Sequence, residues 1–454
     1  MIQALMVKHL SAKIGLAAVA FVLSSPLAQA QSAPGSGLEP KLEAELADGG
    51  KRESELRAFY AARQYRPLWI EDGVPSEAAD TILRLADTAR FDGLSRKALR
   101  ADDLLSALRR TRSGSARDLA RAELALSRTL AAYVQGTRIA RDSGMSYQNS
   151  LLAPVVPTIG SALNAAAAAP VLDDYIGELR WMHPIYAQLR AALAARALDP
   201  VATQLVQLNL ERARALPANP APRYVLIDAA GASLSMYENG RVVDTMRVVV
   251  GKPSQATPMI AGELSSAILN PYWNVPPDLV RDRIAYNVKT KGLGYLKTGG
   301  YQVLSDWTDE AKVLNPAKVD WAAVAAGTQE QRVRQLPGRS NFMGKVKFTF
   351  PNNLGIYLHD TPDKALLKED ARQASSGCVR LEDAGRLGRW LFGKTLLPKK
   401  GAVEQVVPLE QTVPVYITYL TAAPENGAIV FREDTYNRDR TQLATLRSAG
   451  RGSR

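Results

Sequence analysis

Cysteine and histidine are scarce in this sequence. Cys378 is the only cysteine among 454 residues, and His9, His183 and His359 are the only histidines. A lone cysteine excludes an internal disulfide and a metal site built from several cysteines. Packed cores must therefore stabilise the chain, and a chain of this length can supply them in two or more domains.

The neighbourhood of Cys378 favours catalysis over packing. A single free cysteine is more often an inert core residue, but Ser375, Ser376 and Gly377 precede this one. Small residues let the backbone approach a substrate closely. A helix is predicted to follow, from Leu381, Leu387, Trp390 and Leu391 at helical spacing and Gly393 at its end. Cys378 would then precede a helix N-terminus, where the dipole lowers a thiol pKa and N–H groups bind an oxyanion.

His359 is the second candidate. It ends the segment 354–359, whose composition is typical of a buried strand. A thiol becomes a useful nucleophile when a base or a positive environment favours its thiolate. An imidazole at a strand end and a thiol at a helix start are together the parts of a Cys/His acyl-transfer site.

Several segments around these two residues resemble one known family. LHDTP at 358–362, Arg372 and SSGCVR at 375–380 are similar to the catalytic motif of L,D-transpeptidases, the YkuD-like domain. Further similar segments are VVVGKP (248–253), NPYWNVPP (270–277), LNLERARALP (208–217) and VPVYITYLTA (413–422). The larger periplasmic members are the most similar. The resemblance implies an α+β multidomain fold, in which a helical scaffold domain precedes a mostly β catalytic domain with a capping insertion.

Changes of composition and periodicity suggest the domain limits. Residues 1–30 carry Lys8 and Lys13, an apolar run and Ala28-Gln29-Ala30, which are typical of a cleaved signal peptide. An uncleaved anchor is the alternative; either form predicts an extracytoplasmic, periplasmic enzyme. The predicted order is then a flexible leader (31–50), a helical scaffold domain (51–216), a Pro-rich linker (217–222), the catalytic domain (223–432) with a capping subdomain (276–344), and a basic C-terminal tail (433–454).

Local patterns predict individual elements within these limits. The clearest helix spans 115–134, with an apolar stripe of Leu119, Ala122, Leu126, Leu130 and Tyr133. His183 is interpreted as a structural or surface residue. Strands are expected at 224–228, 232–238, 241–250, 264–270, 345–350, 354–359 and 413–421, with Asn239-Gly240 as a hairpin turn.

The resemblance also implies a mechanism. Cys378 would attack the carbonyl that joins the third residue of a peptidoglycan stem, commonly meso-diaminopimelate, to the terminal D-alanine. D-alanine leaves, and an amine then displaces the thioester while His359 moves the protons. The carbonyl of Asp360 would orient the His359 ring, although its carboxylate could simply be solvated. The N–H groups of Gly377 and Cys378 are expected to bind the oxyanion. No cofactor and no metal is expected, and carbapenems should acylate Cys378.

Substrate-binding candidates surround this pair. Arg380 and Arg372 could hold stem-peptide carboxylates, because a guanidinium matches that geometry, or could form structural bridges. Ser375, Ser376, Tyr357, Trp273 and Asn353 are expected to line or support the groove, with core packing as the alternative for the aromatics.

Two features of the sequence differ from the family pattern. The net charge bears on which binding partners are expected. The stretch from Tyr186 to Leu205 leaves no room for the peptidoglycan-binding module that larger relatives carry, and Ser376 stands where short transpeptidases have histidine. Peptidoglycan stem peptides are the expected partners, with an outer-membrane protein as one conceivable acceptor. The net charge of +12 suits an anionic wall or lipid headgroups, and export argues against nucleic acid. The oligomeric state stays open.

Rival functions differ in how well the sequence supports them. A zinc peptidase would need clustered ligands, and a serine D,D-transpeptidase would need S-x-x-K; Lys297-Thr298-Gly299 alone is a chance K-T-G. An L,D-carboxypeptidase using the same Cys/His pair, and a non-enzymatic wall-binding protein, remain open. The acceptor amine also remains open: a neighbouring stem, a D-amino acid or a protein.

Overall fold

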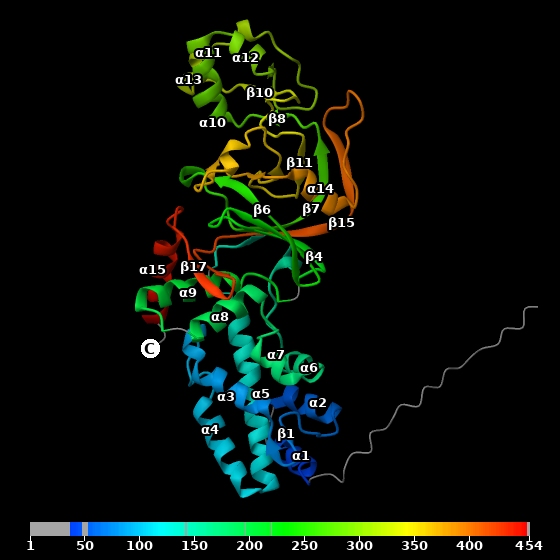
Figure 1. Ribbon diagram of the computed structural model, residues 1–454, viewed down its shortest axis with the longest axis vertical. Helices are drawn as coiled ribbons and strands as arrows, with labels where there is room; N and C mark the ends of the chain where they lie inside the picture. The colour runs from blue at the N-terminus through cyan, green and yellow to red at the C-terminus, as the bar shows by residue number, and fades with distance from the viewer. Residues whose placement is uncertain (1–36, 48–52, 141–142, 196, 219, 452–454) are drawn as a thin grey trace, which may run out of the picture.

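The computed structural model describes residues 37–47, 53–140, 143–195, 197–218 and 220–451. The described chain is elongated, with a helical N-terminal part at one end, a β-rich part in the middle and a small mixed part at the far end (Figure 1). The predicted α+β multidomain class is confirmed. The predicted signal peptide (1–30) lies outside the described residues. No helix in the described ranges is both long and apolar enough to cross a membrane.

The helical part is built around one long central helix. α5 (Ala116–Arg138) buries every residue of the predicted stripe, and Leu119, Leu126, Leu130 and Tyr133 belong to one apolar core. The helices around it are α1 (Glu39–Ala47), α2 (Ser54–Ala62), α3 (Glu77–Asp87), α4 (Ala101–Arg110), α6 (Ile159–Ala167), α7 (Leu172–Gly177), α8 (Pro184–Ala195) and α9 (Pro200–Ala213), and β1 (Ile70–Glu71) pairs with β2 (Val74–Pro75).

The segment predicted as a flexible leader contains helix α1. Leu38, Leu42 and Leu46 are spaced by four residues and are buried in the same core as α5. Glu45, three residues after Leu42, pairs with Arg117 and Arg121 of α5. The expectation of a flexible leader is therefore wrong for residues 39–47, because the Ala and Pro content obscured a regular leucine spacing.

The β-rich part is a nearly closed sheet. The strands follow the order β11-β12-β14-β6-β5-β4-β15-β7, and β11 pairs with both β12 and β7, so the sheet curls back on itself. The bounds are β4 (Arg223–Asp228), β5 (Ser233–Glu238), β6 (Arg241–Gly251), β7 (Ile260–Leu269), β11 (Val346–Thr349), β12 (Leu358–His359), β13 (Gln373–Ser375), β14 (Val379–Leu381) and β15 (Gln405–Thr418). Helix α14 (Ala384–Phe392) packs on the apolar interior of this sheet.

Turn chemistry fixes the register at the start of the sheet. Asn239 and Gly240 both have positive φ, and Glu238 pairs directly with Arg241. A two-residue turn with two positive φ angles matches the twist of a hairpin. The predicted hairpin is confirmed.

The small mixed part lies between strands β7 and β11 in sequence. It contains β8 (Trp273–Asn274), α10 (Pro277–Leu279), a π-helical turn (Val280–Ala285), α11 (Tyr286–Lys291), α12 (Gly294–Thr298), β9 (Tyr301–Leu304), α13 (Trp321–Ala326) and β10 (Arg332–Gln335). Its own core includes Val280, Ile284 and Val333. A separate core lets this insertion act as one body above the β sheet (Figure 1).

His183 joins the helical part to the sheet. Its Nε2 lies 3.0 Å from the hydroxyl of Tyr224, whose ring stacks on Tyr237. Burial lowers the pKa of His183 to about 3, so the imidazole is neutral. The structural interpretation of His183 is therefore confirmed, and a surface position is excluded. A further link between the two parts is β3 (Ser146–Tyr147), which adds a strand to the edge of β7.

The C-terminal residues return to the helical part. After the hairpin β16 (Ala422–Glu425) and β17 (Ala428–Phe431), helix α15 (Arg438–Arg451) packs on α9. Asp439 pairs with the fully buried Arg212 at 2.7 Å. Residues 433–454 were expected to form a basic tail, but this ion pair docks the beginning of the segment against the scaffold.

Candidate active site

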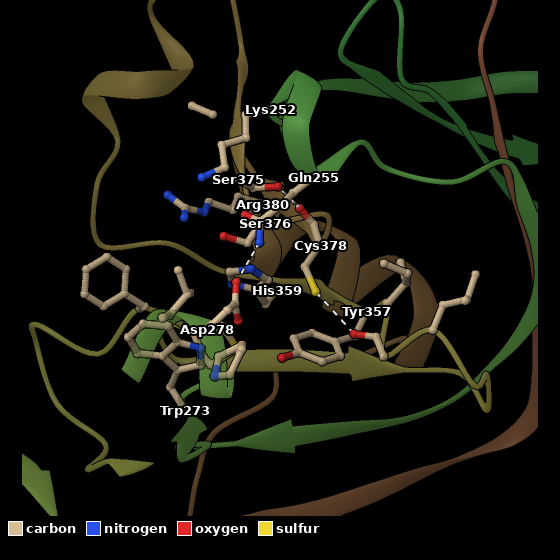
Figure 2. A pocket seen from close by; sticks show the side chains of 18 of the residues that line it. Lys252, Gln255, Trp273, Asp278, Tyr357, His359, Ser375, Ser376, Cys378 and Arg380 are labelled. Carbon is tan, nitrogen blue, oxygen red and sulfur yellow. Dashed lines mark hydrogen bonds between the residues drawn. The ribbon is translucent and has the colours of Figure 1, made fainter. Parts of the chain in front are cut away.

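Cys378 and His359 face one cavity of about 660 Å³ between the β sheet and the small mixed part. Figure 2 shows both side chains directed into this space. The remaining lining residues are Lys252, Gln255, Trp273, Pro276, Asp278, Leu279, Arg283, Phe342, Met343, Leu354, Gly355, Ile356, Tyr357, Ala374, Ser375, Ser376 and Arg380. A cavity of this size, with a thiol and an imidazole on its wall, is suited to a peptide-sized ligand.

Strand pairing brings the two candidates together. β12 and β14 are parallel neighbours, with Leu358 opposite Val379 and His359 opposite Arg380. Cys378 directly precedes β14, and it shares a face with Arg380 because alternate residues of an extended segment point the same way. His359 and Cys378 are nineteen residues apart in sequence, but they lie on or next to two paired strands.

The helix predicted to begin after Cys378 begins later. Val379–Leu381 form strand β14, and α14 starts at Ala384 with Asp383 as its N-cap. These residues pair with β12 and β6 as part of the sheet. Strand pairing therefore prevails over the helical spacing of the sequence. The dipole of α14 therefore does not act at the thiol. Gly393 does end the helix, in the left-handed conformation expected of a C-cap.

His359 is buried and held in one orientation. Its Nδ1 lies 2.5 Å from the carbonyl oxygen of Asp360, so Nδ1–H donates to it and Nε2 is left as the basic nitrogen. The Asp360 carboxylate is engaged rather than solvated, because it accepts from Lys345 N at 3.0 Å and Lys364 Nζ at 2.9 Å. Burial, assisted by the nearby charge of Arg380, lowers the pKa of His359 to about 3. The imidazole is therefore neutral at neutral pH.

The Cys378 thiol is protonated at rest. Its Sγ donates to the carbonyl of Gly355 over 3.4 Å, which Figure 2 marks. Burial raises the pKa of this thiol above its usual range. The expectation of a lowered thiol pKa is therefore not met, and a neutral thiol and a neutral imidazole share the cavity. Such a pair requires proton transfer to His359 during the attack rather than before it.

The turn before Cys378 is tied down by Ser375. The buried Ser375 hydroxyl accepts from Gly377 N at 3.2 Å and donates to Cys378 O at 2.6 Å. Gly377 has φ +109°, which L residues rarely adopt. Because the Gly377 N–H is already used by Ser375, it is not free for an oxyanion, contrary to expectation. The Cys378 N–H donates to no acceptor among the described residues.

Most of the other expected residues lie in the cavity, but two do not. Tyr357, Trp273, Ser376 and Arg380 line it. Arg372 does not, because its guanidinium bonds the carbonyls of Glu369 and Gly231 and so forms the structural bridge that was its alternative role.

Asn353 is also absent from the cavity lining and is exposed. Its neighbour Asn352 is the supporting residue, since its amide donates to Phe350 O and Ile356 O while its Oδ1 accepts from Ile356 N. The expectation misplaced this role by one residue.

Four polar lining residues were not predicted. Lys252 and Gln255 follow β6, whereas Asp278 and Arg283 come from the small mixed part. Gln255 Nε2 donates to Asp278 Oδ2 at 2.9 Å, so this bond joins the two walls of the cavity (Figure 2). The only signal for them was their position inside or beside the segments VVVGKP and NPYWNVPP.

The cavity is cationic and has one acidic group. Arg380 forms no ion pair within the described ranges, and its Nε has no hydrogen-bond partner there. Burial lowers the pKa of Arg380, but the group stays charged at neutral pH. A half-buried guanidinium with no ion-pair partner is unfavourable unless a ligand supplies an anion. The site is therefore suited to a carboxylate near the thiol.

The resting protonation state has a testable pH dependence. Because the Cys378 pKa is raised, alkylation by iodoacetamide should still increase with pH where N-acetylcysteine has levelled off. Because the His359 pKa is about 3, acylation should stay flat between pH 7 and pH 5. Alkylation rates measured at alkaline pH and acylation rates measured between pH 5 and pH 7 check the two statements. An acid limb near pH 6.5 would contradict the neutral imidazole.

Comparisons with known proteins agree with this arrangement. A model of the scaffold domain matches residues 54–193, and a model of the L,D-transpeptidase catalytic domain, YkuD, matches residues 222–414. A curated Haemophilus influenzae protein named "Putative L,D-transpeptidase" is 29% identical over 399 residues, covering 85% of this chain and 78% of its own.

Two solved structures are more distant. An L,D-transpeptidase from Mycobacterium smegmatis is 14% identical with a TM-score of 0.21, over 43% of this chain and 58% of that one. A mutant of the Enterococcus faecium L,D-transpeptidase is 11% identical with a TM-score of 0.23, over 44% of this chain and 52% of that one. The chain thus spans little more than half the length of either structure. The chain therefore contains a scaffold domain at residues 54–193, followed by an L,D-transpeptidase catalytic domain at residues 222–414.

Proposed function

We propose that this protein is a peptidoglycan L,D-transpeptidase that works through a thioester on Cys378. One observation carries the proposal: a thiol and an oriented neutral imidazole share a cavity with an unpaired guanidinium, Arg380. The donor is a tetrapeptide stem, and the scissile bond joins its third residue to the terminal D-alanine. Arg380 would hold a stem carboxylate, because its guanidinium otherwise lacks a partner.

The first half-reaction forms the thioester. His359 Nε2 takes the thiol proton as Sγ attacks the carbonyl carbon, and the carbonyl electron pair moves onto oxygen. The Cys378 N–H donates to that oxyanion. When the oxyanion collapses, the C–N bond breaks, and His359 returns the proton to the departing D-alanine amine. The Asp360 carbonyl keeps the same tautomer of His359 throughout.

The second half-reaction transfers the acyl group. An acceptor amine attacks the thioester, His359 takes its proton, and Cys378 leaves as a thiol when that proton returns. A stem side-chain amine as acceptor gives a 3-3 cross-link; a D-amino acid or an outer-membrane protein amine gives an exchanged or anchored product. The small mixed part would cap the groove and limit water. The signal features of residues 1–30 support a periplasmic location for this reaction.

Product analysis tests the reaction class. With a tetrapeptide donor and excess acceptor amine, cross-linked or exchanged product should exceed free tripeptide. Asp278→Ala breaks the bond between Gln255 and Asp278 that joins the cap to the sheet, and the tripeptide share should rise severalfold. Mass analysis of the products measures both.

The opposite results have defined meanings. A wild-type enzyme that yields mainly tripeptide despite abundant acceptor would be an L,D-carboxypeptidase, with the catalytic residues unchanged. No product of either kind would favour a non-enzymatic wall-binding protein.

A further inference from the structure

A buried threonine lies directly beneath the catalytic turn. Thr257 is fully buried and does not line the cavity. Its hydroxyl accepts from Gly251 N at 2.8 Å and donates to Gly377 O at 2.7 Å. Because the hydroxyl proton is committed to Gly377, the direction of this hydrogen bond is fixed.

The bond to Gly377 O sets the direction of the next N–H. The Gly377 carbonyl and the Cys378 N–H belong to one planar trans peptide, so they point in opposite directions. Thr257 holds the carbonyl toward the interior, and the N–H therefore points away from the interior, on the side where Cys378 meets the cavity. This is the donor that has no protein acceptor among the described residues.

The turn at Gly377 needs a hydrogen bond from outside the turn to fix its conformation. Gly377 at φ +109° has access to more backbone conformations than any other residue type would have. Ser375 ties the N–H side of Gly377, and Thr257 ties its carbonyl side. Without the bond from Thr257, the peptide between Gly377 and Cys378 could rotate. The Cys378 N–H would then no longer point toward the oxyanion.

The C-terminal segment holds the threonine in turn. The Tyr436 hydroxyl donates to Gly251 O at 2.6 Å, and Arg438 donates to Thr257 O at 2.8 Å. The Arg438 guanidinium lies 5.0 Å from the centre of the Tyr436 ring. The adjacent Asp439 is paired with buried Arg212 of α9. A continuous set of contacts thus runs from the scaffold to the catalytic turn.

We infer that Thr257 is a positioning residue that aims the Cys378 N–H at the oxyanion, and that residues 436–439 hold Thr257 in place. This rests on the proposed acyl transfer by Cys378. Removing one oxyanion donor typically lowers the rate by a factor of about 10²–10³. Thr257→Val keeps the donor but frees its peptide, so a smaller loss, about 20-fold, is expected.

Two reactions of the same thiol separate positioning from general damage. Acylation by p-nitrophenyl acetate forms a thioester, releases p-nitrophenolate and passes through an oxyanion. Alkylation by iodoacetamide displaces iodide and forms no oxyanion. For Thr257→Val we expect the acylation burst to slow by about 20-fold while the alkylation rate stays within about 2-fold of wild type. Thr257→Ser, which keeps the hydroxyl, should restore acylation to within about 3-fold.

A second variant and a blank complete the test. Tyr436→Phe removes the hydroxyl that donates to Gly251 O, and it should slow acylation by about 3-fold with alkylation unchanged. This variant tests the inference if Thr257→Val does not fold. Equal falls in both reactions, or wild-type acylation in both variants, would overturn the inference. A wild-type burst no larger than that of Cys378→Ala would instead overturn the nucleophile itself.

Discussion

Cys378→Ser is expected to lower turnover of a tetrapeptide donor by about 10⁴-fold or more, because a hydroxyl is a much weaker nucleophile than a thiol in a site with no stronger base than a neutral imidazole. The fold should survive. The serine hydroxyl can still donate to Gly355 O, the acceptor that the thiol uses now. We expect a melting temperature within about 2 °C of wild type. Turnover assays and thermal melts on the two proteins check this.

The single cysteine makes this result easy to interpret. Cys378 is the only thiol in the chain, so labelling reports on this residue without further substitutions. Turnover within tenfold of wild type in the serine variant would show that another group is the nucleophile.

His359→Asn is expected to lower kcat by about 10³-fold, because the variant lacks a group that can take and return the proton. The asparagine amide can still donate toward the Asp360 carbonyl, so the local backbone should stay in place. Alkylation of Cys378 at high pH, where hydroxide removes the proton, should persist. Steady-state kinetics and an alkylation profile measure the two effects.

His183→Asn is the matched control. His183 is the only other histidine that the structure describes, and it is also buried and neutral. Its loss removes the contact with Tyr224 and should cost about 1–2 kcal/mol of stability without changing kcat. Equal losses of kcat in both variants would contradict a catalytic role for His359.

The sequence predicted the candidate Cys/His pair because its motif is local. Cys378, His359 and Asp360 lie in two short segments, and parallel pairing of β12 with β14 is enough to bring them together. The scaffold, most strands of the sheet and the central helix α5 were also predictable from periodicity and turn residues. The buried strand expected at 354–359 is only β12 (Leu358–His359), and Leu354 and Gly355 are exposed.

The protonation state and the surroundings of the site were not predictable, because they depend on tertiary contacts. Burial reverses the expected shift of the thiol pKa, and strand pairing moves the helix away from Cys378. Ser375 takes the Gly377 N–H that was expected to bind the oxyanion. Thr257 lies 120 residues before Gly377, and nothing in its local sequence marks it.

Dependence on tertiary contacts also explains why Arg372 was misassigned and why four lining residues were missed. Arg372 matched the motif, but the bend at 369–372 folds its guanidinium back onto backbone carbonyls. Arg380 and Asp278 reach the cavity from two separate parts of the chain. Only the assembled fold shows that Arg372 bonds backbone carbonyls, whereas Arg380 forms no ion pair among the described residues.

The most direct test of the account is the mass of the intact protein during turnover. Wild-type protein is mixed with a tetrapeptide donor without acceptor and quenched in acid, which preserves a thioester. We expect an added mass equal to the donor without its D-alanine, located on the peptide that contains Cys378, lost on addition of an acceptor amine, and absent in Cys378→Ser. Product formation with no covalent adduct, or an adduct on any other residue, would contradict a thioester mechanism at Cys378.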